Sequence, residues 1–172
     1  NVTTISNYQW SVCFNFTVKY SIAAPIPDGF YKIMSTIDVA SGVTASKSDC
    51  LMTKAPCALY FRFDLSTGYY SISSEGMTLA LNDGNIAFAE PDGSTRQQWS
   101  LVKVAGGYAI VNAATGNALD DRWRDTSEGA LVWGYEPSLN NQAQTWILKT
   151  TETKTIENGT YRILSKLDPH LA

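Results

Sequence analysis

The sequence has few of the residues that bind metals or nucleic acids. Its one histidine is His170, and none of its three cysteines, Cys13, Cys50 and Cys57, shows Cys-x-x-Cys spacing, so we expect no metal site. Charged residues are only 17% of the chain, the net charge is −3, and Lys or Arg never form a run, which argues against nucleic acid as a partner. Apolar runs stay well short of the roughly 18 residues that a membrane span needs, so we expect no membrane insertion.

The usual catalytic patterns are also missing. Asp120 and Asp121 are adjacent, so on a strand they would point to opposite faces and could not form the facing pair of a glycosidase. His170 lies outside the repeated region described below, which disfavours a Ser-His arrangement, and no glycine-rich phosphate loop precedes a helix. We expect neither enzyme activity nor a cofactor.

The cysteines leave two alternatives open. A disulfide between Cys50 and Cys57 would close a short loop rich in Lys and Pro. Alternatively, all three thiols are buried and act as small hydrophobic residues.

What the sequence does contain is a repeat. "RQQWSLVKV" (96–104) and "NQAQTWILKT" (141–150) both carry Gln-x-Trp with an apolar residue two positions later. Gly-aromatic segments that read as strand openings recur at about the same period, with Tyr31, Tyr70 and Tyr108 separated by 39 and 38 residues. We therefore predict three units of about forty residues from 28 to 150. The motif residues of these units, with Phe63 of "YFRFDLS" assigned to the tryptophan position of the first, are Gln97, Trp99, Gln144, Trp146 and Phe63.

Each unit is expected to contain four strands. In the second unit these are residues 69–74, 77–81, 85–89 and 97–104, and "NDGN" (82–85) predicts a tight hairpin because Asp-Gly can supply positive φ angles. Helical apolar periodicity is lacking over any stretch longer than about ten residues. The pattern predicts a closed all-β architecture with almost no helix.

Three four-stranded units ending in Gln-x-Trp resemble the ricin-B-type β-trefoil lectins and carbohydrate-binding modules, over roughly residues 28–150. The resemblance implies a β-trefoil in which Trp99, Trp146 and Phe63 pack a shared core around a pseudo-threefold axis. It implies that these aromatic residues are structural and do not contact sugar.

The resemblance also implies where a sugar would bind. In the family, an Asp between strands two and three of a unit accepts sugar hydroxyls and an aromatic residue stacks on the ring. In the third unit Asp120 matches the carboxylate and Tyr135 the aromatic residue. Asn141, Gln142 and Trp123 are candidates for the surrounding wall, with Arg122 and Arg124 also within reach. We expect that the other two units do not bind sugar.

Three residues indicate that the first two units lack a sugar site. Ala80 in the second unit and Ala45 in the first are assigned to the Asp position, and Ala89 falls near the aromatic position. In the third unit, Ala143 directly precedes Gln144 where sugar-binding members often have Asn, which weakens galactose-type specificity. At most one weak site is expected, and Asp120 and Tyr135 could instead be ordinary hairpin residues.

The two ends of the chain extend beyond the repeats. Residues 8–20 alternate between apolar and polar side chains, so we interpret 1–27 as a strand and linker that ends a preceding domain or straps the trefoil. Residues 151–172 read as a linker and the start of a further, truncated trefoil repeat.

These observations lead to two functional hypotheses. The first is a non-catalytic carbohydrate-binding module of a larger secreted or cell-surface protein, with a glycan or surface glycoprotein as its partner. The second is a trefoil without functional sugar sites that serves as a protein-interaction, toxin or inhibitor, or spacer domain.

Overall fold

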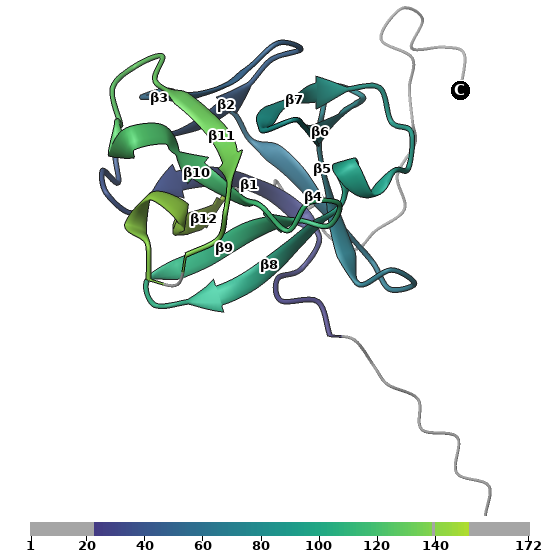
Figure 1. Ribbon diagram of the computed structural model, residues 1–172. Coiled ribbons are helices and arrows are strands. Elements are labelled where there is room, and N and C mark those ends of the chain that lie inside the picture. Colours follow the sequence, from purple (N-terminus) through teal and green to yellow (C-terminus); the bar gives the residue numbers. More distant parts are fainter. Residues whose placement is uncertain (1–22, 139, 152–172) are drawn as a thin grey trace, which may run out of the picture.

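The computed structural model describes residues 23–138 and 140–151 (Figure 1). The strand predicted at 8–20 and the further repeat predicted beyond 151 lie outside these residues. The described part is all-β, as predicted, with three single-turn 3₁₀ helices, and it contains no helix long and apolar enough to cross a bilayer. The strands are β1 Gly29–Ser35, β2 Gly42–Ala45, β3 Cys50–Thr53, β4 Leu59–Asp64, β5 Tyr69–Ser74, β6 Met77–Asn82, β7 Asn85–Ala89, β8 Trp99–Val104, β9 Gly107–Asn112, β10 Ala118–Asp121, β11 Leu131–Tyr135 and β12 Trp146–Thr150; the 3₁₀ helices are η1 Thr95–Gln97, η2 Arg122–Arg124 and η3 Gln142–Gln144.

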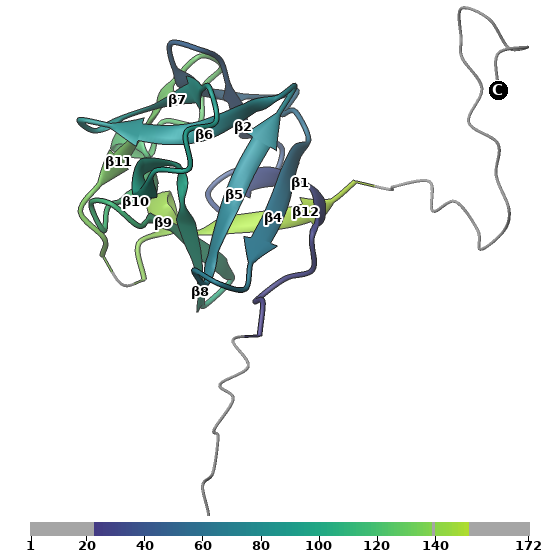
Figure 2. The same ribbon diagram turned by 90° about the vertical axis from the view of Figure 1, so that its right-hand side faces the viewer.

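Six strands close into an antiparallel barrel. The pairs run β1–β4, β4–β5, β5–β8, β8–β9, β9–β12 and back through β12–β1. The other six form the hairpins β2–β3, β6–β7 and β10–β11, which are joined through β11 to β3 and β7. Figure 2 shows β4 and β5 side by side, with β6 and β7 above them. The chain is therefore a β-trefoil of three four-stranded repeats, as predicted.

The second repeat confirms the strand assignment closely. Its strands β5, β6, β7 and β8 coincide with the predicted segments to within two residues. Asp83 and Gly84 have φ angles of 48° and 87°, which the two central residues of a type I′ hairpin turn require. The hairpin between β6 and β7 is thus set by local sequence.

The two tryptophans of the repeated motif lie in the core. Trp99 is 0% exposed and Trp146 is 1% exposed. The indole N–H of Trp99 donates to the carbonyl of Leu79 (3.0 Å), and that of Trp146 donates to the carbonyl of Leu119 (2.9 Å). Each tryptophan therefore ties the last strand of its repeat to the second strand.

The glutamine of each motif holds the loop that precedes it. The side-chain amide of Gln97 donates to the carbonyl of Glu90 and its oxygen accepts from the backbone N–H of Asp92. Gln144 makes the same two bonds to Glu136 and Ser138. Both glutamines are buried, so each satisfies two backbone groups at the edge of the core.

The first repeat departs from its predicted alignment. In the barrel Tyr70 pairs with Trp99 and Tyr108 with Trp146, whereas Tyr31 pairs with Leu59. Leu59 therefore occupies the tryptophan position and the assignment of Phe63 was wrong. Leu59, Phe61 and Phe63 alternate along one strand, so the apolar pattern alone could not select among them.

Phe63 lies four residues after the tryptophan position, partly buried against Tyr70 at a ring-centroid distance of 4.9 Å. Cys57 takes the place of the glutamine. Cys50 is buried, Cys57 is partly buried and both are free thiols, so these two residues fit the second alternative raised by the sequence; Cys13 lies outside the described residues. Burial raises the pKa of the Cys50 thiol, as expected for a small core residue.

One carboxylate lies in the core without a partner. Asp121 is buried on β10, and neither of its carboxylate oxygens has a hydrogen-bond partner among the described residues. Burial, with the charges of Asp120 and Asp125, raises the pKa of Asp121 from 3.8 to about 6. The ionised form therefore disfavours the folded state.

Replacing Trp146 with alanine should lower the free energy of unfolding by roughly 3–5 kcal/mol, because the change leaves a cavity and an unpaired Leu119 carbonyl. Urea denaturation followed by circular dichroism measures this loss. Trp123→Ala is the matched control, since that indole is exposed, and it should change stability by less than about 0.5 kcal/mol. Comparable losses in the two variants would contradict the core assignment of Trp146.

Asp121→Asn should stabilise the protein at about pH 7, by about 1–2 kcal/mol, because a buried unpaired charge is removed. The folded-state pKa lies above the unfolded value, so the cost of the charge is absent below about pH 4, grows between about pH 4 and 6, and is complete above. Thermal melting at about pH 3.5 and pH 7 should show the gain at the higher pH alone.

Asp125→Asn is the control of opposite sign. Hydrogen bonds from Ser127 lower the pKa of Asp125, so its carboxylate stabilises the fold above its unfolded pKa and this variant should lose stability at about pH 7. A stability gain for Asp121→Asn that is the same at both pH values would contradict the charge explanation.

Candidate functional site

The three cap hairpins can be compared position by position because they share one register. Leu79 and Leu119, which accept the tryptophan N–H bonds, are each followed by the position of the predicted carboxylate. That position and the residue opposite it are Asp120 with Trp133 in the third repeat, Ala80 with Ala87 in the second and Thr44 with Leu51 in the first. Two residues further along the opposite strand stand Tyr135, Ala89 and Thr53, respectively.

This comparison confirms Ala80 and Ala89 in the second repeat and corrects the first. Gly42 pairs with Met34 of the barrel as Ala118 pairs with Val111, so the equivalent of Asp120 is Thr44 and not Ala45. The single-residue shift could not be seen in the sequence, because the first repeat lacks the tryptophan that marks the register. Only the third hairpin carries a carboxylate facing aromatic residues.

Asp120 holds the ring of Trp133. The indole N–H of Trp133 donates to Oδ1 of Asp120 at 2.9 Å, across the β10–β11 pair. Asp120 is 6% exposed, and this burial raises the pKa of its carboxyl, opposed by the bonds from Trp133 and Gln144. The carboxylate thus fixes the orientation of an aromatic side chain.

Trp133 is the middle ring of an aromatic row. Tyr135 stacks on it with a centroid distance of 5.0 Å and an interplanar angle of 15°, and Trp123 lies at 6.2 Å with an angle of 40°. The Arg122 guanidinium lies over the Trp133 ring at 4.7 Å, a cation–π contact. Trp123 is 79% exposed and Tyr135 is 51% exposed, so the two outer rings face solvent.

The segment that carries Trp123 has an unusual backbone. Trp123 and Arg124 have φ angles of 64° and 60°, in the left-handed region that non-glycine residues rarely occupy. Such a conformation costs on the order of 1–3 kcal/mol for each residue and persists where surrounding contacts enforce it. Here the guanidinium of Arg124 donates to the side-chain oxygen of Gln142 at 2.8 Å.

The other predicted wall residue has a structural partner. Asn141 caps η3, its side-chain oxygen accepting from the backbone N–H of Ala143 at 3.0 Å. The structure therefore brings Asp120, Tyr135 and Trp123 together through Trp133 and links Gln142 to the same segment. The side-chain oxygen of Asn141 is instead used in capping η3.

Trp133 was not predicted from the sequence. It could have been, since it stands two residues before Tyr135 and alternate residues of a strand share a face. Arg122 was expected within reach of the pocket, but its position over the Trp133 ring depends on the turn of η2 and could not be predicted. These two residues complete the cluster.

The arrangement is suited to binding. Exposed aromatic faces, a carboxylate and guanidinium groups recognise the apolar and hydroxyl faces of a small ligand. Asp121, the neighbour of Asp120, is buried and does not face it across a cleft. In the described part of the chain no group of three or more His, Cys, Asp or Glu side chains could hold a metal ion.

Comparison with solved structures shows the same fold. A designed threefold-symmetric protein, ThreeFoil, matches with a TM-score of 0.64 and 26% identity, over 72% of this chain and all of its own. A mosquitocidal holotoxin matches with a TM-score of 0.69 and 21% identity, over 84% of this chain and 20% of its own. A Polyporus squamosus lectin, bound to a sialylated epitope, matches with a TM-score of 0.62 and 18% identity, over 72% of this chain and 49% of its own.

Several of the matching proteins are thus much longer than the region shared with this chain. No curated protein sequence matches the chain significantly. A family model described as "Ricin-type beta-trefoil lectin domain-like" matches residues 56–120 and 95–171, which together span more than half of the sequence. The chain belongs to the ricin-type β-trefoil lectin domain-like family.

Proposed function

We propose that this domain is a non-catalytic carbohydrate-binding module with one weak glycan site, on the β10–β11 hairpin of the third repeat. One observation carries the proposal. Three hairpins share a backbone position, and only the third places a carboxylate, Asp120, beside aromatic side chains. The fold does not need this set, because the other two hairpins form with Ala80 and Thr44 there.

Tyr135 and Trp123 supply the stacking faces. Both rings are exposed, and Tyr135 is held flat against Trp133, so its outer face is oriented before a ligand arrives. A preoriented aromatic face covers the C–H patch of a sugar with little loss of side-chain entropy. Trp133 is covered by Tyr135 and by Arg122, so it supports the site from below.

Asp120 has two roles in this proposal. Its Oδ1 accepts from Trp133 and orients the ring, which leaves Oδ2 as the acceptor for a sugar hydroxyl. Gln142 and Arg124, already bonded to each other, form the polar wall on the η2 side. Asn141 adds its amide N–H₂ group, since its oxygen is used in capping η3.

The alternative is a trefoil that has lost sugar binding and serves as a protein-interaction, toxin or inhibitor, or spacer domain. The burial of Asp120 and its bond to Trp133 favour this alternative, because a structural carboxylate needs no ligand.

In either case we propose that the domain is part of a larger secreted or cell-surface protein. The holotoxin match, in which the shared region is one fifth of that chain, supports a modular setting.

A titration of ¹⁵N-labelled protein with galactose, lactose and N-acetylglucosamine tests the site. A single shallow site should bind with a dissociation constant on the order of 0.1–1 mM, and shifts should map to residues 118–144. Tyr135→Ala should weaken binding at least about fivefold, because the stacking face is lost. Phe30→Ala, which removes an exposed aromatic ring on β1, is the matched control and should bind normally.

Asp120→Asn separates the two functional hypotheses. If Asp120 contacts sugar, this variant should lose roughly 1–3 kcal/mol of binding energy without a fall in melting temperature. Shifts confined to the first two repeats would refute the assigned site. A properly folded protein that binds no sugar on a glycan array would instead establish the alternative.

A further inference from the structure

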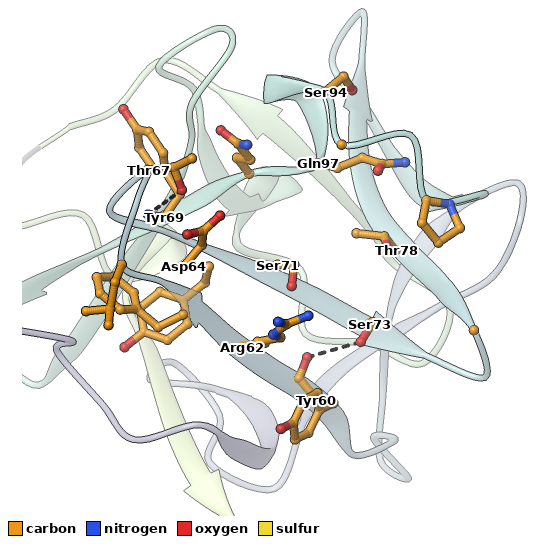
Figure 3. A pocket seen from close by; sticks show the side chains of 17 residues that line it. Tyr60, Arg62, Asp64, Thr67, Tyr69, Ser71, Ser73, Thr78, Ser94 and Gln97 are labelled. Atoms are coloured by element: carbon orange, nitrogen blue, oxygen red, sulfur yellow. Dashed lines mark hydrogen bonds between the residues drawn. The ribbon is translucent and has the colours of Figure 1, made fainter.

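A groove of ≈ 700 Å³ lies between the first two repeats, away from the third hairpin (Figure 3). One wall is the outward face of the β4–β5 hairpin. The other is formed by Thr78 of β6 and by residues from the segment 91–98. Its volume is typical of small-molecule sites, and the residues of the third-repeat cluster do not line it.

The hairpin wall is a regular array of polar side chains. Alternate residues of a strand share a face, so the residues between the core positions Phe61, Tyr70 and Ile72 point outward into the groove. Each outward-facing residue of β4 is paired with a residue of β5 that carries a hydroxyl group. The three pairs are Tyr60 with Ser73, Arg62 with Ser71, and Asp64 with Tyr69.

The next repeat shows that the fold does not require this chemistry. The β8–β9 hairpin forms a smaller groove of ≈ 330 Å³ at the equivalent place. The residues of its other wall are Pro137, Ser138, Asn140, Asn141, Gln144 and Thr145. Where the first hairpin has Arg62 and Asp64, the second has Val102 and Val104. The third barrel pair, β1–β12, has Lys149 and Thr151 at these positions. The combination of a guanidinium with a carboxylate therefore occurs in the groove between the first two repeats alone among the three equivalent places, and a ligand accounts for it better than stability does.

The groove has hydrogen-bond donors without acceptors. The side chain of Arg62 is exposed and makes no hydrogen bond or ion pair within residues 23–138 and 140–151. Ser71 and Thr78 likewise have no side-chain partner there, and the bond from Ser73 to the Tyr60 carbonyl is long, at 3.5 Å. Figure 3 shows Arg62 directed toward Ser71 and Ser73 and away from Asp64. These donors converge on one part of the groove.

The opposite end of the groove carries a negative charge. The Asp64 carboxylate accepts from the hydroxyl and the backbone N–H of Ser66, and these bonds lower the pKa of Asp64, so its carboxyl is ionised. Asp64 therefore repels an anion and accepts from hydroxyl groups, whereas Arg62 attracts an anion. Tyr60 and Tyr69 flank the two ends with aromatic rings.

We propose that this groove binds a sugar that carries a carboxylate. The guanidinium of Arg62 bonds the carboxylate through two parallel N–H donors, and Ser71 and Ser73 bond the sugar oxygens next to the carboxylate. The sugar hydroxyls remote from the carboxylate lie toward Asp64, and a tyrosine ring covers a C–H face of the sugar. The inference shares with the proposed function only the premise that the domain binds sugars, since it uses none of the third-repeat residues.

A matched pair of ligands tests the inference on the full chain. Glucuronate and glucose differ in having a carboxylate or a CH₂OH group at one carbon, so an NMR titration with each isolates the carboxylate. Glucuronate should shift the amide signals of residues 60–73 and 91–98, and glucose should bind there at least about tenfold more weakly. N-acetylneuraminate and a sulfated galactose show whether another acidic sugar, or a sulfate, is accepted.

The variants Arg62→Gln and Arg62→Lys test the role of the guanidinium. The first should weaken glucuronate binding at least about tenfold, and the second should be intermediate, because lysine is a point charge without the planar fork. Both should keep the melting temperature, since Arg62 is exposed and makes no bond in the described part of the chain. Lys103→Gln makes the same change in net charge on β8 and should leave binding unchanged.

Several outcomes would overturn the inference. They are equal binding of glucose and glucuronate, loss of binding in Lys103→Gln as large as in Arg62→Gln, or a preference for the sulfated sugar. Tyr135→Ala keeps this test separate from the third-repeat site, because it should leave glucuronate binding in the groove intact. Glucuronate shifts confined to residues 118–144 would refute the groove while supporting the third-repeat site.

Discussion

The buried bond from a tryptophan indole to a leucine carbonyl is the contact on which two of the three repeats depend. In two repeats it joins the last strand to the second, and the neighbouring glutamine secures the loop between them. The first repeat has Leu59 and Cys57 at these positions and makes neither bond. An aromatic cluster fills that part of the core instead, with Phe61 at 5.4 Å from Tyr31 and 6.2 Å from Tyr70. Apolar volume thus replaces a specific hydrogen bond in one of three equivalent places.

The pseudo-threefold symmetry separates what folding requires from what it does not. Three cap hairpins and three pairs of barrel strands adopt one backbone arrangement with different side chains. A residue type present in one copy and absent from its equivalents is therefore not demanded by the fold. By this criterion three residues need a functional explanation. They are Asp120 and Trp133 in the third hairpin, and Arg62 in the first barrel hairpin.

Departures from good packing gather in the third repeat. Trp123 and Arg124 have left-handed backbones, Asp121 is buried without a partner among the described residues, and burial raises the pKa of Asp120. Each of these features costs stability. The second repeat has Ala80 and Leu81 in place of the two aspartates, and of these features only the left-handed turn recurs there, at Asp83 and Gly84. Local strain and buried charge beside exposed aromatic rings are typical of binding sites, where recognition and stability make opposing demands.

The sequence by itself determined the fold class, the three repeats and the buried tryptophans. These follow from local and periodic signals, such as the Asp83-Gly84 turn and the spacing of the Gln-x-Trp motifs, which each segment carries alone. Asp120 and Tyr135 could also be selected from their position in the repeat. Their partner Trp133 required only the two-residue periodicity of a strand.

Only the tertiary structure decided the register of the first repeat and the surroundings of each candidate residue. Leu59 and Phe63 share one apolar alternation, so the choice between them depends on which residue Tyr31 meets across the barrel. The groove beside Arg62 is built from two repeats, and its lining residues range from Tyr60 to Gln98. Such contacts are absent from sequence patterns because they arise when strands distant along the chain pair, and a shift of one residue reverses which face each side chain occupies.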